Sequence, residues 1–399
     1  MGILRQIHIV FEDDVAEFSH GGVIKGAVVL DVDGDRDLGL QRVKGVWIQF
    51  KGVAKIEWTN TSYNRTSGTT ESDFHTQRED YLKKTIVLFG TGRFDRDIDN
   101  LSIPPGRTSH PFALPVPSEP LLPQSFQGIY GYIRYTATAT VSVKRMRVNT
   151  ETKTTRPFIM TGPKVDLNII PSIETPVKTR ISQSDCCGCG TMVERVITIG
   201  LPKRGYVTND VIYVVGKIDN RDGEEEIFFD ATLVQRIIFT CGKHTRTKEY
   251  SLCRASKSVT CLRGWVTDFK VGPLHLATSG PPSGVPGCDL IDVEYYVKCS
   301  GCKFTKTFPV IVGTVPIRGA TPARPTADSF VPVPADTVAL HGTRAVHAPI
   351  TTDGSSKESS DESEPDETKR LFRASPPDYD FDSLSPPNYH QVMKTFQSH

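Results

Sequence analysis

Two proline–tyrosine tetrapeptides near the end of the chain have the residue types and spacing of a binding motif. They read Pro376-Pro377-Asp378-Tyr379 and Pro386-Pro387-Asn388-Tyr389, so both fit the pattern P-P-x-Y. Adjacent prolines favour polyproline II, so the bound shape exists before binding and little ordering entropy is lost. WW domains stack aromatic rings on such prolines and hold the tyrosine in a second pocket. The predicted contact residues are therefore Pro376, Pro377, Tyr379, Pro386, Pro387 and Tyr389, and a solvated, proline-containing linker is the alternative.

Three serines upstream of these motifs lie among acidic residues: Ser359, Ser360 and Ser363. Acidic-directed kinases favour such serines, and phosphorylation would deepen the negative charge of the tail. Simple solvation of the hydroxyls is the alternative. From Ile350 onward the chain has ten acidic and five basic residues, although its overall net charge is +1. A sum so near zero argues against a nucleic-acid platform, so no nucleic-acid partner is expected.

All nine cysteines of the chain lie between Cys186 and Cys302. An odd number of cysteines in a cytosolic chain argues against a disulfide scaffold. Two clusters leave a zinc site open as a less favoured interpretation, with the ligands Cys186, Cys189, Cys299 and Cys302. The clusters lie more than a hundred residues apart, so reduced thiols are the favoured interpretation. No cofactor is expected.

Catalytic motifs such as G-x-S-x-G, H-E-x-x-H or a phosphate-binding P-loop are not found, so the chain is not expected to be an enzyme. Cys261 is a candidate redox thiol because the nearby Arg263 could lower its pKa, but an inert core residue is the alternative. Three basic residues at the end of a predicted strand could contact acidic lipid headgroups or phosphorylated cargo: Lys144, Arg145 and Arg147. A solvated strand end is the favoured alternative.

Strict alternation of apolar and polar residues dominates the chain before its tail. One apolar face comprises Val46, Ile48, Phe50, Ala54, Ile56 and Trp58. Similar alternation runs over residues 133–143 and 293–297. This period is typical of half-buried strands and predicts an all-β fold of antiparallel sheets packed face to face. Residues 69–84 are polar and lack a clean apolar stripe, so they are the best candidate for a helix or an irregular insertion.

The order of aromatic, turn, strand and proline-rich segments occurs twice along the chain, which predicts two similar β-sandwiches in tandem. We expect a first domain over residues 1–155, a connector over 156–185 and a second domain over 186–318. From residue 319 to 399 the composition of proline, alanine, threonine, serine and acidic residues predicts a disordered tail.

Several segments together carry a resemblance to a known family. In the first half they are residues 21–26 (GGVIKG), 46–52 (VWIQFKG), 56–58 (IEW), 111–115 (PFALP), 122–128 (LPQSFQG) and 131–135 (GYIRY). In the second half they are residues 204–206 (RGY), 218–220 (IDN), 288–295 (CDLIDVEY) and 308–316 (FPVIVGTVP). With its two P-P-x-Y motifs, the chain resembles the α-arrestin (arrestin-domain-containing) family over roughly residues 5–318. It departs at Asn209, where the family usually has glycine in a turn, but asparagine tolerates the left-handed conformation.

The resemblance implies two tandem arrestin-like, immunoglobulin-type β-sandwich domains and the role of an adaptor. Family members couple transmembrane receptors or transporters to WW-domain HECT ubiquitin ligases of the Nedd4 class, and so promote ubiquitylation, endocytosis and endosomal sorting. Such a protein would be cytoplasmic and peripheral at the plasma membrane and endosomes. No signal peptide or membrane-spanning run is visible in the sequence, in line with that expectation.

Two other functions fit parts of the sequence. An arrestin-fold trafficking scaffold or coat subunit would use the same sandwiches without recruiting a ligase. A thioredoxin-linked redox regulator is the second alternative, because one vertebrate member of the family binds thioredoxin through a cysteine. The tail distinguishes the first alternative, since a coat subunit has no need of two WW ligands.

Overall fold

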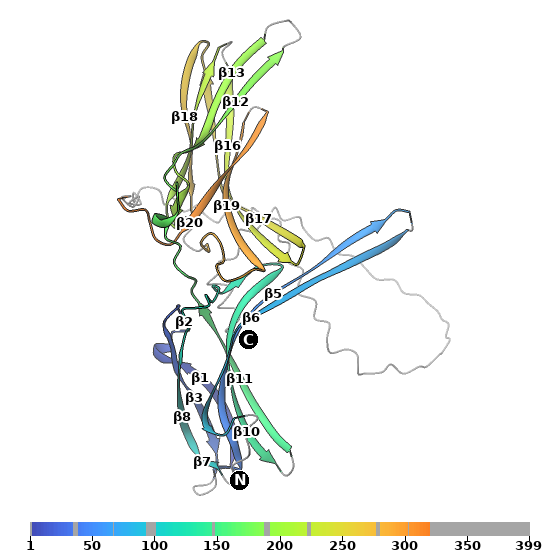
Figure 1. Cartoon of the computed structure of the whole chain (residues 1–399), viewed down its shortest axis with the longest axis vertical. Helices are drawn as coiled ribbons and strands as arrows, with labels where there is room; N and C mark the ends of the chain where they lie inside the picture. Colours follow the sequence, from blue (N-terminus) through green and yellow to red (C-terminus); the bar gives the residue numbers. More distant parts are fainter. Residues whose placement is uncertain are drawn as a thin grey trace, which may run out of the picture. The chain divides into compact units, whose positions relative to one another are not determined.

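The structure is a computed structural model that describes residues 2–34, 39–66, 68–92, 101–145, 148–186, 192–221, 225–276, 280–301 and 303–319. Figure 1 shows that these residues form β-strands arranged in sheets. Helical structure in the described ranges is limited to two 3₁₀ turns, η1 (Glu12–Asp14) and η2 (Leu167–Ile169). The predicted all-β class is confirmed.

The first sandwich packs two sheets face to face. One sheet has the order β1 (Ile3–Phe11), β3 (Val23–Asp33), β8 (Gly106–Pro115). The other has the order β2 (Glu17–Phe18), β11 (Val148–Met160), β10 (Gly131–Arg145), β5 (Val43–Asn64), β6 (Thr69–Gly90), and β9 (Phe126–Gln127) also pairs with β10. A short ribbon joins β4 (Leu40–Gln41) to β7 (Ser102–Ile103).

Alternating apolar residues of β5 and β10 build the core of this sandwich. The predicted apolar face of β5, from Val46 to Trp58, is buried at every named position. Gly52 continues this face without a side chain, because a Cβ there would lie 2.4 Å from Cε1 of Tyr135. Edge-to-face ring contacts join Phe50 and Phe158 to neighbouring phenylalanines. Each buried phenylalanine stabilises the fold by about 1.5–3 kcal/mol.

The second sandwich repeats this plan. One sheet has the order β12 (Val177–Cys186), β13 (Met192–Leu201), β15 (Val211–Asn220), β18 (Trp265–His275). The facing sheet has the order β14 (Gly205–Val207), β20 (Phe304–Gly313), β19 (Ile291–Gly301), β16 (Glu225–Cys241), β17 (His244–Cys261). The short β14 pairs in parallel with β20, as β2 pairs in parallel with β11 in the first sandwich. The two parallel pairs occupy equivalent places, in line with the internal repeat inferred from the sequence.

The structure differs from the sequence-based expectations for residues 69–84 and for the bounds of the connector. Residues 69–84 are neither helical nor irregular but belong to β6, so that prediction is wrong. β6 pairs with β5 along its whole length, which fixes it as a strand without an apolar stripe of its own. At the predicted connector, β11 continues to Met160 and β12 begins at Val177, so the stretch between these strands covers residues 161–176.

Two further predictions concern the turn at Asn209 and the C-terminal tail. Asn209 has φ +72°, as the left-handed turn expected there requires. Of the predicted disordered tail, residues 320–399 lie outside the described part of the chain.

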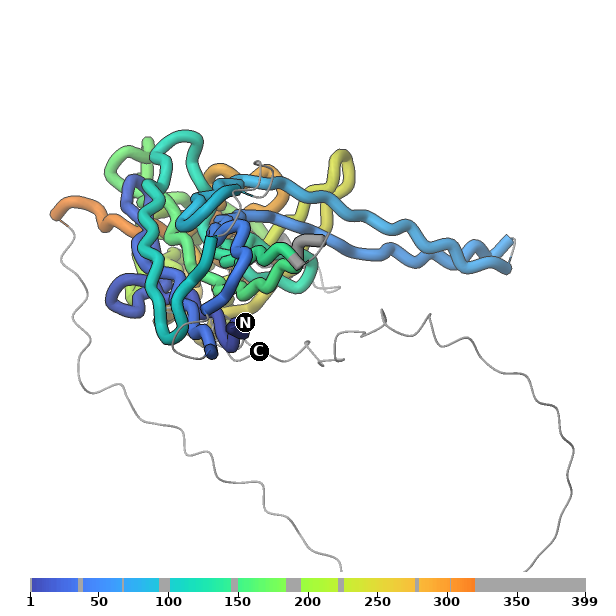
Figure 2. The backbone as a smooth tube through the Cα atoms, turned by 90° about the horizontal axis from the view of Figure 1, so that it is seen from below, coloured from blue at the N-terminus to red at the C-terminus, as the bar shows by residue number. Residues whose placement is uncertain are grey.

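Strands β5 and β6 extend beyond the rest of their sheet. β10 pairs with β5 only as far as Ile56, whereas β5 and β6 remain paired as far as Asn64 and Thr69. Figures 1 and 2 both show the resulting two-stranded ribbon running on from the sheet. We call residues 58–66 and 68–76 the arm.

Candidate partner-binding surfaces

The predicted WW-binding residues, the two P-P-x-Y motifs at 376–379 and 386–389, lie outside the described residues. The same holds for the predicted phosphorylation sites at Ser359, Ser360 and Ser363. The WW-binding motifs and the phosphorylation sites therefore both stay predictions.

The predicted basic group is only partly described. Lys144 lies half-buried near the end of β10, and its backbone N–H donates to the carbonyl oxygen of Arg42 at 2.9 Å. The side chain of Arg145 and the whole of Arg147 lie outside the described residues. Contact of this group with lipid or cargo stays a prediction.

The cysteines that the structure describes lie mostly within the second sandwich core or at its edge. Cys261 is 0% exposed, and its thiol donates to the carbonyl oxygen of Val259 at 3.6 Å. This burial favours the alternative of an inert core residue, because a redox partner must reach the sulfur. Burial also raises the pKa of the Cys299 thiol to about 12. Since thiolate is the zinc-binding form, this raised pKa disfavours Cys299 as a zinc ligand.

The remaining predicted zinc ligands cannot be compared with it, because the side chain of Cys186 and the residues Cys189 and Cys302 lie outside the described part. Within the described ranges, no three His, Cys, Asp or Glu side chains lie close enough together to hold a metal ion.

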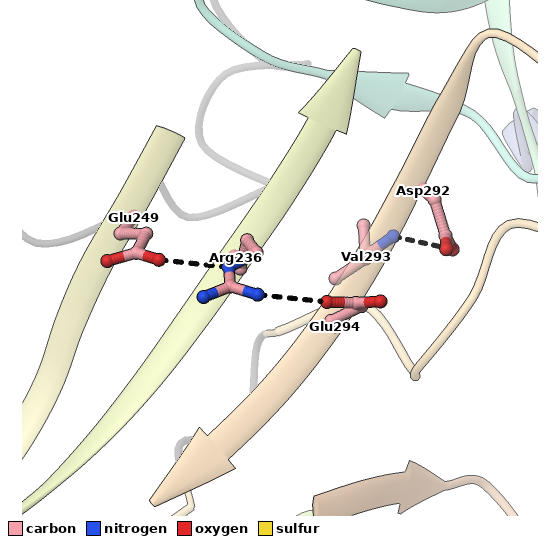
Figure 3. A network of polar contacts seen from close by, with 5 residues as sticks. All are labelled: Arg236, Glu249, Asp292, Val293 and Glu294. Carbon is pink, nitrogen blue, oxygen red and sulfur yellow. Dashed lines mark hydrogen bonds and ion pairs between the residues drawn. The ribbon is translucent and has the colours of Figure 1, made fainter. Parts of the chain in front are cut away.

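The outer face of β17, β16 and β19 carries a ladder of charged side chains that sequence reasoning missed (Figure 3). Arg236 of β16 lies between two carboxylates on the neighbouring strands. Its Nε donates to Oε1 of Glu249 at 2.9 Å, and its Nη1 lies 3.6 Å from Oε2 of Glu294. The strand registers pair Arg236 directly with Glu249 and with Glu294. The signal in the sequence was the alternation itself, which predicts that these polar positions share the outer face.

Hydrogen bonding in this ladder perturbs the ionisation of its members. The hydrogen bond with Glu249 raises the pKa of Arg236. Burial raises the pKa of Glu249, but hydrogen bonds with Arg236 and Tyr296 outweigh that effect, so the net pKa is below its usual value. Ions of both signs are thus held in their charged forms by each other.

Beside the ladder is a hollow of about 270 Å³ whose lining includes Asp230, Thr232, Arg254, Lys298 and Ser300. Arg254 Nη2 lies 2.9 Å from Asp230 Oδ2. A hydrogen bond from Ser256, with a second from Arg254, lowers the pKa of Asp230. The hollow offers donors and acceptors to a polar partner, and its charges of both signs give it no preference for an anion or a cation.

A larger pocket of about 580 Å³ lies near the end of the described chain and is lined by Lys203, Tyr206, Tyr213 and Arg318 among others. Lys203 Nζ lies 4.8 Å from the ring centroid of Tyr206. Burial, followed by the nearby charge of Asp210, raises the pKa of Tyr206, so its phenol stays protonated. Glu174 also lines the pocket and Lys203 Nζ lies 3.6 Å from Oδ2 of Asp210, so charges of both signs surround it and give no preference for an anion.

The turn between β16 and β17, together with the first residues of β17, contacts the base of the arm. The backbone N–H of Gly242 donates to Oε1 of Gln77 at 3.0 Å, and Arg246 Nη1 donates to the carbonyl oxygen of Thr59 at 3.1 Å. The rings of His75 and His244 lie 4.6 Å apart between centroids. These contacts link elements more than a hundred and sixty residues apart, so no local pattern in the sequence could reveal them.

Despite these contacts at its base, residues 59–66 and 68–74 of the arm are all exposed. Tyr63 and Phe74 are the large apolar side chains of this stretch, with 64% and 60% of their surface exposed. Exposed aromatic side chains are enriched at protein interfaces, so the arm is a second candidate partner-binding surface.

No helix long and apolar enough to cross a membrane occurs in the described residues.

Comparison with known proteins gives a consistent set of relatives. Residues 7–168 match the family model of the arrestin (or S-antigen) N-terminal domain. The chain is 28% identical over 249 residues to arrestin domain-containing protein 1 of Rattus norvegicus, a match covering 62% of this chain and 53% of that protein. It is 24% identical over 332 residues to arrestin domain-containing protein 4 of Homo sapiens, covering 80% and 73%. The chain thus spans about half the length of the first of these relatives.

Proposed function

We propose that the chain is an α-arrestin that acts as an adaptor in membrane-protein trafficking, because residues 7–168 match the arrestin N-terminal domain and the chain is similar to arrestin domain-containing proteins 1 and 4. In this role the sandwiches engage transmembrane receptors or transporters, and the tail recruits a WW-domain HECT ubiquitin ligase of the Nedd4 class. The ligase then ubiquitylates the cargo, which is internalised and sorted through endosomes. The adaptor itself works as a cytoplasmic protein, peripheral at the plasma membrane and endosomes, and carries out no catalysis.

The observation that carries this proposal is the pair of P-P-x-Y motifs, residues 376–379 and 386–389, on a chain whose residues 7–168 match the arrestin N-terminal domain. A single tetrapeptide contacts a small surface, so one motif alone binds weakly. Two motifs ten residues apart span up to about 31 Å in polyproline II. They can therefore occupy two WW domains of one ligase, and the second contact gains from a high effective concentration.

The tail also sets the reach of the bound ligase. If residues 318–375 behave as a flexible chain, their root-mean-square span is about 40 Å. A ligase held at that distance can modify lysines over a wide volume around the cargo. Shortening this stretch by half should change which cargo lysines are modified, whereas unchanged site usage would contradict the tether.

Binding of the full chain to immobilised tandem WW domains tests the ligase half of the proposal. Tyr379→Ala and Tyr389→Ala should each weaken retention, and the double variant should lose it. Tyr132→Ala, a change of the same type in β10 of the first sandwich, serves as the matched control and should leave retention unchanged. If the double variant is retained as well as the natural chain, the ligase half of the proposal is wrong. The alternative of a scaffold or coat subunit without ligase recruitment then remains.

The redox alternative has less support. It needs a thiol that a thioredoxin-like protein can reach, and Cys261 is 0% exposed. A thioredoxin that lacks its resolving cysteine would trap a mixed disulfide with Cys261 if this alternative were correct. Absence of that adduct leaves the adaptor as the function that fits both halves of the chain.

A further inference from the structure

The arm loses the support of its sheet where β10 ends. The backbone N–H of Glu57 still donates to the carbonyl oxygen of Tyr130 at 2.8 Å. Past this point β5 and β6 pair with each other as far as Asn64 and Thr69. The second sandwich reaches the arm at its near end, through contacts to Thr59 and Gln77. The far part of the arm is therefore an exposed two-stranded ribbon, which is marginally stable in water without a further partner.

The two faces of the arm differ in chemistry. Residues directly opposite in an antiparallel pair lie on the same face, and successive residues alternate between faces. The register places six uncharged residues on one face: Thr59, Thr61, Tyr63, Thr70, Ser72 and Phe74. The other face carries Glu71 opposite Ser62 and Asp73 opposite Asn60. One face is thus aromatic and uncharged, and the other is acidic.

The outer edge of β6 is open. β6 is the last strand of its sheet, and within the described residues no strand pairs with its outer side. An edge strand presents a row of backbone N–H and C=O groups that can pair with another chain, and proteins commonly block such edges with lysine or proline. Residues 69–77 (TTESDFHTQ) contain neither lysine, arginine nor proline. The charged side chains of this stretch are the carboxylates Glu71 and Asp73, so its edge is protected by negative charge alone.

The negative charge of Glu71 and Asp73 favours a basic strand over a second copy of this chain as the binding partner of β6. Two copies of this chain pairing antiparallel through β6 about Ser72 would place Glu71 of each copy opposite Asp73 of the other, and like charges directly opposite destabilise a sheet. A strand with lysine or arginine at alternate positions would instead pair with both carboxylates. Cytoplasmic segments next to membrane-spanning helices carry an excess of these residues.

We propose that the outer edge of β6 in the arm binds an extended, basic cytoplasmic segment of a membrane protein by strand addition. This inference rests on the proposed function and specifies how the adaptor binds its cargo. The added strand pairs its backbone with residues 69–76. Its lysine or arginine side chains lie beside Glu71 and Asp73, and its uncharged side chains lie beside Thr70 and Phe74.

The test uses the full chain and a ten-residue probe peptide in which lysine alternates with valine and threonine. Binding of the probe should slow hydrogen–deuterium exchange in residues 69–76. Glu71→Lys together with Asp73→Lys should weaken binding about tenfold, as expected for the loss of two cross-strand charge pairs. Asp268→Lys is the matched control, because Asp268 is an exposed carboxylate on β18, an edge strand of the second sandwich. It should leave the affinity unchanged.

A second probe separates strand addition from simple charge attraction. The same peptide with an N-methyl group on every residue of its central six keeps its charge but cannot donate backbone hydrogen bonds to β6 from either edge. Loss of binding supports the proposal, and binding equal to that of the first probe overturns it. Protection of residues 69–76 that rises with protein concentration alone would also overturn it, since a second copy would then occupy the edge.

Titration of tandem WW domains into the same preparation keeps this inference separable from the proposed function. If the probe fails while the WW domains bind, the strand-addition inference is wrong and the ligase half stands. If the probe binds while the WW domains do not, the ligase half is wrong.

Discussion

Arg246 of the second sandwich donates a hydrogen bond from Nη1 to the carbonyl oxygen of Thr59 in the arm, over 3.1 Å. The same nitrogen lies 3.0 Å from Oδ1 of Asn60, and the guanidinium lies 4.4 Å from the ring centroid of Tyr130. Arginine suits this position because its planar group can bond in its plane and stack on a ring at once. The base of the arm is thereby held by a side chain from outside its own sheet.

Replacing this arginine should loosen the arm. Arg246→Ala removes a charged donor to two acceptors, so we expect a loss of about 1 kcal/mol in local stability. Hydrogen exchange should be faster in residues 58–60 and 75–77. Arg254→Ala, on the same strand but paired with Asp230, is the control and should leave exchange in the arm unchanged. Equal exchange rates in the arm of both variants would contradict the role of Arg246.

The ladder around Arg236 should give a pH-dependent stability. Arg236→Ala leaves Glu249 and Glu294 without their shared cation, and the expected loss is about 1 kcal/mol at pH 7 for such partly exposed charges. The pKa of Glu249 is lowered in the folded chain. Its stabilisation is therefore complete above its unfolded pKa of about 4.5 and disappears as the pH falls through the folded value.

Chemical denaturation near pH 7 and near pH 3 checks this expectation. The difference in free energy of unfolding between the natural chain and Arg236→Ala should shrink at the lower pH. Glu17→Gln, in the short β2 of the first sandwich, provides a control without a place in the ladder. A difference that stays constant across this range would show that Arg236 contributes through packing and not through charge.

Thiol reactivity should follow burial. Cys261 and Cys299 are both 0% exposed, and burial raises the pKa of Cys299 to about 12. Neither should react with a maleimide in the folded chain near pH 7, whereas both should react in denaturant. Mass spectrometry of labelled peptides measures this. Fast labelling of Cys261 in the folded chain would reopen the redox alternative.

Phe50 of β5 and Phe74 of β6 should differ sharply in their contribution to the free energy of unfolding. Phe50 is 0% exposed and Phe74 is 60% exposed. Phe50→Ala should cost about 3–5 kcal/mol in the free energy of unfolding, as other buried phenylalanines do. Phe74→Ala should change it by less than about 0.5 kcal/mol. A large loss on replacing Phe74 would mean that the arm packs against the body of the fold.

The part of the fold that follows strand periodicity could be predicted from the sequence. Val46, Ile48 and Phe50 are buried where their alternation places them, and Asn209 adopts the left-handed turn. Residues 69–84 could not be predicted in this way, because most of them are exposed and they form no apolar period. Pairing with β5 makes them a strand, and such pairing depends on residues distant in the sequence.

The candidate surfaces also differ in whether local sequence patterns reveal them. The P-P-x-Y motifs are local patterns, so they could be found without a structure. The contact of Arg246 with Thr59, and the cation shared between Glu249 and Glu294, bring together residues from separate strands. Alternation indicates which face each of these residues occupies, but only the register indicates which of them meet.

Calorimetric titration of tandem WW domains from a Nedd4-class ligase into the full chain tests the central claim most directly, with the Tyr379→Ala, Tyr389→Ala double variant measured beside the natural chain. The account predicts binding by the natural chain, weaker binding by each single variant and none by the double variant. Binding that persists unchanged in the double variant, or that is absent from the natural chain, would contradict the assignment of this protein as a ligase adaptor.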